Sequence, residues 1–144
     1  MTRTEDVVNG YFYRFVYESV YGTRVADPTP LIYCTGPSTK NINNFRGLNF
    51  HHLPLKQREE LLQKMQISKQ VLENGVRAIF TEEELNRMVP GCAIAIREYS
   101  RKRVFECNRL DNEEVPGAIY SDVARLNPVK RLLDWLLHSR EEDK

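Results

Sequence analysis

A run of alternating aromatic side chains near the start of the chain constrains the fold most. In residues 11–17, Tyr11, Tyr13, Phe15 and Tyr17 occupy every second position. Period-two spacing places the four rings on one face of a β-strand. We expect this face to pack on a hydrophobic core. The alternative is an exposed face, where aromatic rings anchor protein partners or stack on nucleic-acid bases.

Two further strands are expected before the first helix. Pro28 and Pro30 place the strand 31–35 near a sheet edge or just after a bend, because proline cannot donate to a strand ladder. A loop rich in Ser, Asn and Gly separates it from a third strand, 45–53. Three short strands so close in sequence predict a small, strongly bent antiparallel sheet, an SH3-like partial barrel.

Helical spacing begins after Pro54. Leu61, Leu62 and Met65 fall on one stripe, charged residues including Arg58 fall elsewhere, and Asn74-Gly75 is a C-terminal stop.

Three more elements follow this helix. Thr81 and Glu84 have the spacing of a capping box, which predicts a short helix ending near residue 89. Residues 92–100 are predicted to be helical, and residues 104–110 to form a strand.

The last predicted element is an amphipathic helix over residues 127–140. Asn127 caps it, Pro128 takes its first position, and Trp135 lies off the centre of its leucine stripe. The fold class is therefore α+β in one domain, 1–144. We divide it into a sheet-rich part (10–54), a helical and mixed part (55–126) and the C-terminal helix (127–140).

Composition excludes several classes of protein. A chain of 144 residues with 41% hydrophobic residues, 28% charged residues and a formal charge of +1 is neither a disordered tail nor a strongly basic nucleic-acid binder. No segment has the roughly 18 apolar residues of a membrane span, and the N-terminus lacks the apolar core of a signal peptide. We expect no membrane partner and synthesis in a reducing cytoplasm.

Neither histidines nor cysteines form a recognisable reaction centre. His51 and His52 would point to opposite faces of the third strand, so they cannot easily share a metal. Cys34, Cys92 and Cys107 are widely spaced, which favours small buried hydrophobes over a disulfide or zinc framework. Arginines near Cys107 in sequence leave open a lowered pKa and a nucleophilic thiol. We predict no catalytic residue, metal, cofactor or small-molecule substrate: the chain is expected not to be an enzyme.

The strongest charge feature is a basic cluster of Arg97, Arg101, Lys102 and Arg103, with Tyr99 nearby. It could bind phosphates while Tyr99 stacks on a base, or it could be a solvated junction between two elements.

A protein interface is the other candidate site, because aromatic residues are favoured interface anchors. Its candidate residues are Tyr11, Tyr13, Phe15, Tyr17, Trp135 and Leu136.

The pattern resembles a family of small proteins of T4-like tailed bacteriophages. That family has an aromatic opening strand, then Asp-x-x-Pro-Leu-Ile, then Gly-Leu-Asn-Phe-His-x-Leu-Pro before an Arg-containing helix. The matching residues are Tyr11, Tyr13, Tyr17, Asp27, Pro30, Leu31, Ile32, Gly47, Leu48, Asn49, Phe50, His51, Leu53, Pro54 and Arg58. The match covers residues 10–60 and, loosely, 90–110. Val25, Ala26 and His52 stand where the family usually has aromatic residues.

The resemblance implies a context rather than a mechanism. Members are described as virion structural proteins or as proteins that protect the ends of packaged DNA. We therefore expect a non-enzymatic structural or assembly component of a phage tail, baseplate or neck. It would be made in the host bacterial cytoplasm, reside in the virion and contact other phage proteins in a multi-copy assembly. The alternative is a DNA-end-binding protein that acts at head completion and packaging.

Overall fold

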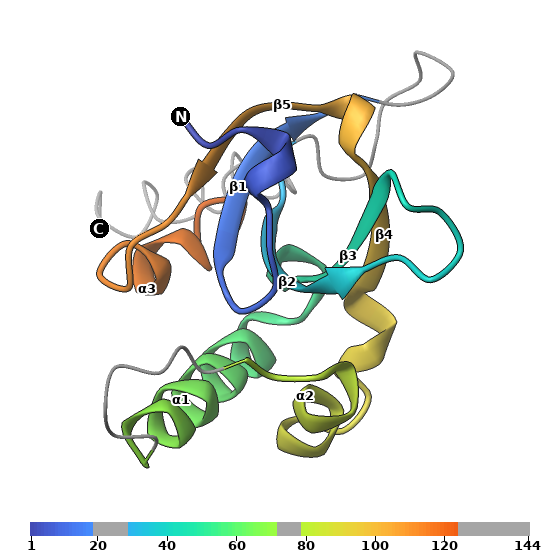
Figure 1. The fold of residues 1–144 in the computed structure, drawn as a ribbon. Helices are drawn as coiled ribbons and strands as arrows, with labels where there is room; N and C mark the ends of the chain where they lie inside the picture. The colour runs from blue at the N-terminus through green and yellow to red at the C-terminus, as the bar shows by residue number, and fades with distance from the viewer. Residues whose placement is uncertain (19–28, 72–78, 124–144) are drawn as a thin grey trace, which may run out of the picture.

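A curved five-stranded antiparallel sheet organises the chain (Figure 1). The computed structural model describes residues 1–18, 29–71 and 79–123. Along the sheet the strand order is β4-β3-β2-β1-β5, so the last strand pairs back onto the first. The strands are β1 (Phe12–Tyr17), β2 (Leu31–Pro37), β3 (Asn44–Asn49), β4 (Ile96–Ser100) and β5 (Val104–Arg109).

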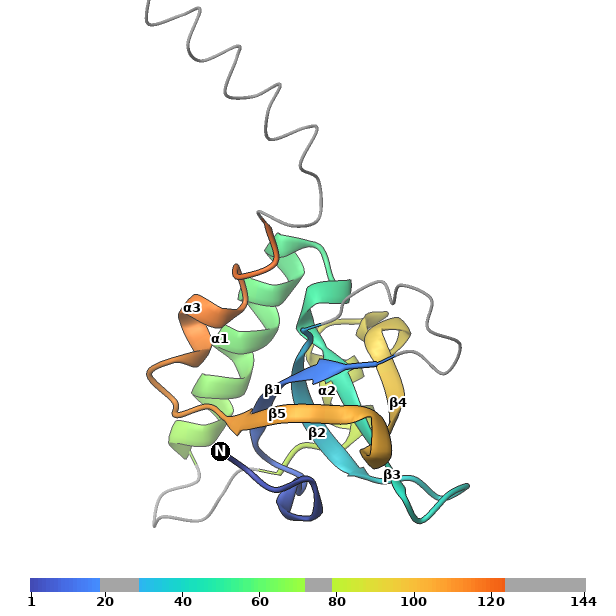
Figure 2. The ribbon, with the colours of Figure 1, turned by 90° about the horizontal axis from the view of Figure 1, so that it is seen from above.

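Three α-helices accompany the sheet in the described residues, which makes the fold α+β as predicted. In Figures 1 and 2, α1 and α2 cover one side of the sheet, and α3 lies beside α1. The helices are α1 (Leu55–Val71), α2 (Glu82–Met88) and α3 (Val115–Ala118). Short 3-10 turns complete the fold: η1 (Thr4–Asp6), η2 (Phe50–His52), η3 (Cys92–Ala95) and η4 (Arg101–Arg103).

The sheet curls without closing into a barrel. A register shift in β2 falls at Gly36, whose φ of +145° suits glycine, and another interrupts the β1–β5 pairing. The curl brings the end of β1 to β4, where the Ser100 N–H donates to the Tyr17 hydroxyl at 3.1 Å. The rings of Tyr17 and Tyr99 meet edge to face with centroids 5.2 Å apart. This contact joins strands that are not neighbours in the sheet.

Two hydrophobic clusters lie on opposite faces of the sheet. The cluster under the helices contains Tyr33, Leu48 and Phe50 with side chains of α1, α2 and α3. The cluster inside the curl contains Tyr13, Phe15, Phe45 and Tyr99, with Val7 of the N-terminal segment against it. Alternating side chains of the same strands thus enter different cores.

Several sequence predictions are confirmed. The strands predicted at 11–17, 31–35 and 104–110 are present, and so is the helix after Pro54. The Thr81–Glu84 capping box has both of its hydrogen bonds. The aromatic face of β1 does pack on a core.

Two predictions about the elements are wrong. The third strand ends at Asn49 and not at residue 53, because the Asn49 side chain accepts the His51 N–H and starts η2. The expected helix 92–100 is helical only over η3 and continues as β4, because pairing with β3 satisfies its backbone groups. Of the two placements expected for the strand 31–35, the one after a bend is observed: a bend at residue 29 and Pro30 precede β2, which is central in the sheet, so no ladder bond is lost.

Other predictions fall outside the described residues. These are the turn region with Asp27 and Pro28, the stop at Asn74-Gly75 and the helix 127–140.

Gly47 is required by a close approach between β3 and β2. A Cβ at this position would lie 2.1 Å from Ile32 Cγ2 and 3.0 Å from the Tyr33 carbonyl oxygen. We expect Gly47→Ala to lower the free energy of unfolding by about 1–3 kcal/mol. Gly117→Ala is the matched control: it meets nothing within 4 Å, so it should be neutral or stabilising by about 0.4–1 kcal/mol. Urea unfolding followed by circular dichroism measures both, and equal effects would contradict the packing argument.

Candidate functional site

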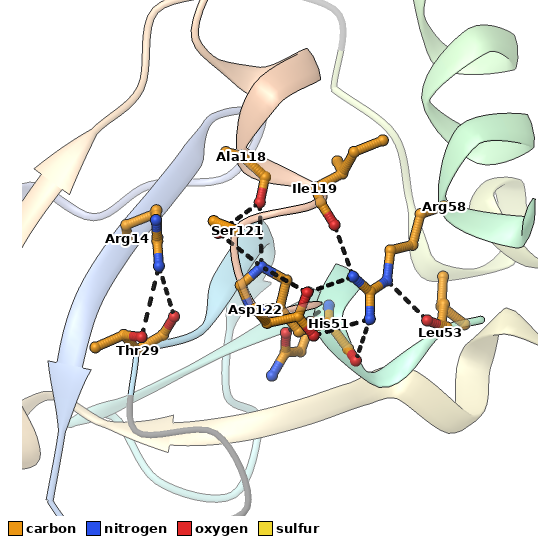
Figure 3. Close-up of polar contacts among 10 residues, drawn as sticks. Arg14, Thr29, His51, Leu53, Arg58, Ala118, Ile119, Ser121 and Asp122 are labelled. Atoms are coloured by element: carbon orange, nitrogen blue, oxygen red, sulfur yellow. Dashed lines mark hydrogen bonds and ion pairs between the residues drawn. The ribbon is translucent and has the colours of Figure 1, made fainter. Parts of the chain in front are cut away.

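A buried arginine on α1 forms the densest polar site in the described chain (Figure 3). Its Nε donates to the Leu53 carbonyl at 2.7 Å, and Nη2 donates to the His51 carbonyl at 2.7 Å. Nη1 donates to the Ile119 carbonyl at 2.6 Å. The Asp122 carboxylate receives both remaining bonds, at 2.6 Å from Nη1 and 3.0 Å from Nη2. All five guanidinium donors of Arg58 are therefore used.

This arginine junction, defined as Arg58 with its four partners, connects three segments. It lies one turn into α1 and reaches back to η2 and across to the end of α3. Arg58 is 3% exposed and Asp122 is 2% exposed. Burial of a charge is tolerated because the opposite charge is bidentate and every donor has an acceptor. Sequence reasoning placed Arg58 on the polar side of the helix, and that placement is wrong.

The junction continues into a Ser-His-Asp grouping that lacks the geometry of a catalytic triad. His51 Nε2 lies 3.2 Å from the Ala118 carbonyl, 3.3 Å from Ser121 Oγ and 3.9 Å from Asp122 Oδ1. A carbonyl only accepts hydrogen bonds, so Nε2 must carry the proton and cannot serve as the base for Ser121. Asp122 also lies on the serine side of the ring, whereas a triad carboxylate orients the opposite nitrogen. The Ser121 hydroxyl itself donates to Ala118.

Of the two adjacent histidines, one is buried and the other is exposed. His51 is 4% exposed within η2, whereas His52 is exposed. The predicted placement on opposite faces of a strand is wrong, since η2 is a turn of helix. Across the described residues, no group of three or more His, Cys, Asp or Glu side chains is arranged to hold a metal ion.

All three cysteine thiols are buried. Burial raises the pKa of Cys107 to about 11, and the opposing effect of Arg101 is smaller. Burial likewise raises the pKa of Cys92. The sequence alternative of a pKa lowered by neighbouring arginines is therefore wrong, because desolvation outweighs the nearby charge. Neutral, inaccessible thiols are poor nucleophiles.

The aromatic strand does not offer its predicted docking surface. Tyr13 is 0% exposed and Phe15 is 2% exposed, so their candidate role at an interface is wrong. Tyr11 and Tyr17 are half-buried against the same cluster. The Tyr13 hydroxyl lies 3.1 Å from the Val8 N–H and fixes the N-terminal segment.

The two remaining interface candidates, Trp135 and Leu136, lie outside the described residues.

The four cations of the basic cluster do not share one environment, because Arg101 binds the N-terminal segment and the other three lie at the surface. The Arg101 guanidinium donates to the carbonyls of Thr4 and Val7 and lies 5.2 Å from the centre of the Phe45 ring. It fastens the N-terminal segment over the inner core, so its proposed phosphate contact conflicts with this role. Tyr99, at 5% exposure, is too buried to stack on a base.

The other three cations of the cluster remain at the surface. Arg97 and Lys102 are exposed, and Arg103 is half-buried. Arg97 Nη1 donates to the Ile94 carbonyl at 2.5 Å and to the Ile96 carbonyl at 3.2 Å. Arg97 lies in β4, and Lys102 and Arg103 lie in η4 directly after it.

A hollow of about 730 Å³ lies between the β1–β5 pair and α3. Arg14 and Arg109 line it together with Glu106 and Glu114, so its formal charges balance. The Arg14 guanidinium donates to Thr29 at its wall, as Figure 3 shows. The hollow therefore has no charge preference that would select a ligand.

No protein-family model, curated protein or solved structure matches this chain. Across the described residues, no helix is both long enough and apolar enough to cross a bilayer.

Removing one partner from the arginine junction should be costly. We expect Arg58→Met to lower the free energy of unfolding by about 3–5 kcal/mol, because Asp122 would stay buried without its counter-charge. Arg58→Lys should also destabilise, because an ammonium group has three donors and cannot reach five acceptors.

Lys56→Met is the matched control, since Lys56 is exposed two residues earlier on the same helix and should change stability by about 0.5 kcal/mol or less. Chemical denaturation of the three variants measures the difference. An Arg58→Met protein as stable as Lys56→Met would contradict the junction.

Proposed function

We propose that this chain is a non-enzymatic structural or assembly component of a tailed-bacteriophage virion. It would act through contacts with other phage proteins in the tail, baseplate or neck. The proposal rests on the resemblance of residues 10–60 to small proteins of T4-like phages. One observation carries it further: the motif residues from Gly47 to Arg58 belong to one packed unit of the fold.

That unit has a clear architecture. Gly47 permits the close approach of β3 to β2, and Phe50 and Leu53 fill the core under the helices. The His51 and Leu53 carbonyls then receive Arg58. A motif used in this way specifies a scaffold, and exposed apolar groups gathered in one patch of its surface would mark a site of protein contact.

Such groups surround the arginine junction. Leu55 is 39% exposed, Tyr120 44% and Val123 47%. Leu55 begins α1, while Tyr120 and Val123 follow α3 in the segment whose Ile119 and Asp122 bind Arg58. They favour a protein partner at this end of the molecule.

The finer description of the fold is part of the proposal. An SH3-like partial barrel is supported by the strand order β4-β3-β2-β1-β5 and by the single 3-10 turn η4 between β4 and β5. The Tyr17–Ser100 bond, which draws β1 to β4, supports it further.

The test is to find the protein in particles. In virions of the phage that encodes it, we expect a constant number of copies per particle after density-gradient purification and a high-salt wash. Quantitative mass spectrometry against isotope-labelled peptides gives that number. Abundant protein in infected cells combined with none in purified particles would reject the proposal.

A second candidate function, binding of DNA ends at head completion, is favoured by one observation. Arg97, Lys102 and Arg103 remain at the surface around β4 and η4. Their charges are close enough in the chain to contact neighbouring phosphates, as a local basic patch can do on a near-neutral protein.

We expect weak, salt-dependent binding to blunt-ended duplex DNA. Changing Arg97, Lys102 and Arg103 together to alanine should reduce the slope of log K against log salt by about 3, because each lost phosphate contact removes nearly one counterion. Lys56→Ala is the matched control and should leave the slope unchanged. Fluorescence anisotropy over a salt series measures the slope. Equal slopes for the parent, the triple variant and Lys56→Ala would exclude this function.

A further inference from the structure

We propose that the outer edge of β4 binds an extended acidic segment of a partner protein as an additional strand. The inference rests on the proposed protein-contact function and deepens it by naming the surface and the chemistry of the partner. It follows from the hydrogen bonding of the two sheet edges, the charges beside β4 and the poor fit of a second copy.

The two edge strands of the sheet, β5 and β4, differ in their hydrogen bonding to the rest of the described chain. At β5, the Thr2 N–H donates to the Cys107 carbonyl at 2.7 Å, and the Thr2 hydroxyl accepts the Arg109 N–H at 2.9 Å. The N-terminal residues therefore take up part of the hydrogen bonding of this edge. β4 stands at the other end of the strand order.

The direction of each backbone group on β4 follows from its register with β3. Arg101 donates its N–H to the Asn43 carbonyl, and Asn44 lies opposite Ser100. Ser100 is therefore a residue whose own N–H and C=O point away from β3. Because these directions alternate along a strand, Ile96 and Glu98 also direct their backbone groups outward.

The ends of this edge are capped by the protein itself. Tyr17 accepts the Ser100 N–H, the Ile96 N–H bonds to the Ala93 carbonyl, and Arg97 donates to the Ile96 carbonyl. Glu98 in the middle differs. Within the described chain, no hydrogen bond reaches its N–H or C=O. One residue of an added strand can satisfy both groups, which is how an edge strand is extended by a partner.

The charges beside the edge favour an acidic partner. Arg97 and Lys102 are exposed, and Arg103 is half-buried. Glu98 is the one acid on β4, and hydrogen bonds from Ser38 and Asn44 hold its pKa below the ordinary value.

The Glu98 carboxylate is therefore engaged on the sheet surface, with Arg46 nearby. An incoming N–H that took the Ile96 carbonyl would displace the longer of the two Arg97 Nη1 bonds and leave the bond to the Ile94 carbonyl in place. The remaining guanidinium donors of Arg97 could then pair with an acidic side chain of the added strand.

A second copy of the chain fits this edge poorly. Two β4 strands paired antiparallel about a two-fold axis place a residue opposite its own copy. The central pair would be either Arg97 with Arg97 or Glu98 with Glu98. Like charges directly opposite each other destabilise a strand pair. A different chain with acidic side chains is the occupant that the edge accommodates.

The test uses the full-length chain and a fluorescein-labelled octapeptide that alternates valine with glutamate. A peptide that alternates valine with lysine is the matched probe. We expect the acidic peptide to bind about tenfold more tightly or better, as measured by fluorescence anisotropy, because the cations beside the edge select it. Equal binding of both peptides, or binding of neither, would overturn the proposal.

Two variants separate backbone pairing from side-chain effects. Glu98→Pro removes the outward N–H and should reduce affinity by about tenfold or more, while an edge strand tolerates proline at such a position. Glu98→Ala loses the same contacts to Ser38 and Asn44 but keeps the N–H, so it should bind like the parent. Equal affinities for the two variants would contradict strand addition.

Arg97→Glu should bind the acidic peptide more weakly by about tenfold, through loss of the cation that pairs with it. Unchanged affinity would contradict the charge argument. Size-exclusion chromatography also tests whether a second copy of the chain binds the β4 edge. A dimer that Glu98→Pro dissociates would overturn the choice of a different chain as the partner. These results do not depend on particle composition, so failure here is distinguishable from absence of the chain from virions.

Discussion

The five hydrogen bonds of one buried guanidinium hold the helical side of this protein to its sheet. Arg58 joins the turn that ends β3, the first turn of α1 and the end of α3. Two of these elements are too short to fix their own position by apolar packing alone, since η2 has three residues and α3 has four. The bidentate ion pair with Asp122 adds an orientation that non-directional burial of apolar surface cannot supply.

On the other face of the sheet, a second arginine has a comparable role. Arg101 binds two carbonyls of the N-terminal segment and lies over Phe45, so the segment closes the aromatic core inside the curl. Of the four cations in the predicted basic cluster, Arg101 thus has a structural role. Exposed apolar groups lie at the start of α1 and after α3, and β4 forms the end of the sheet opposite β5.

Prediction from sequence succeeded where local chemistry decides the outcome. The Thr81–Glu84 capping box depends only on two residues three positions apart. The shared face of the aromatic rings depends only on the period-two geometry of the strand β1. It failed where the partner is distant in sequence. Residues 96–100 form a strand because they pair with β3, which lies about 50 residues earlier in the chain. Arg58 is buried because it pairs with Asp122, which lies 64 residues later in the chain.

The amino-acid sequence alone determined the α+β class, the strand β1 with its aromatic face turned to a core, and the burial of the three cysteines. These follow from periodicity, turn chemistry and hydrophobicity, which act over a few residues. Only the tertiary structure decided which basic residues remain at the surface and which sheet edge the N-terminal residues bind. Both depend on contacts between segments far apart in the chain, such as Thr2 with Cys107 and Arg101 with Thr4. Such contacts leave no local pattern in the sequence, because a hydrogen bond requires only that its two groups meet in space.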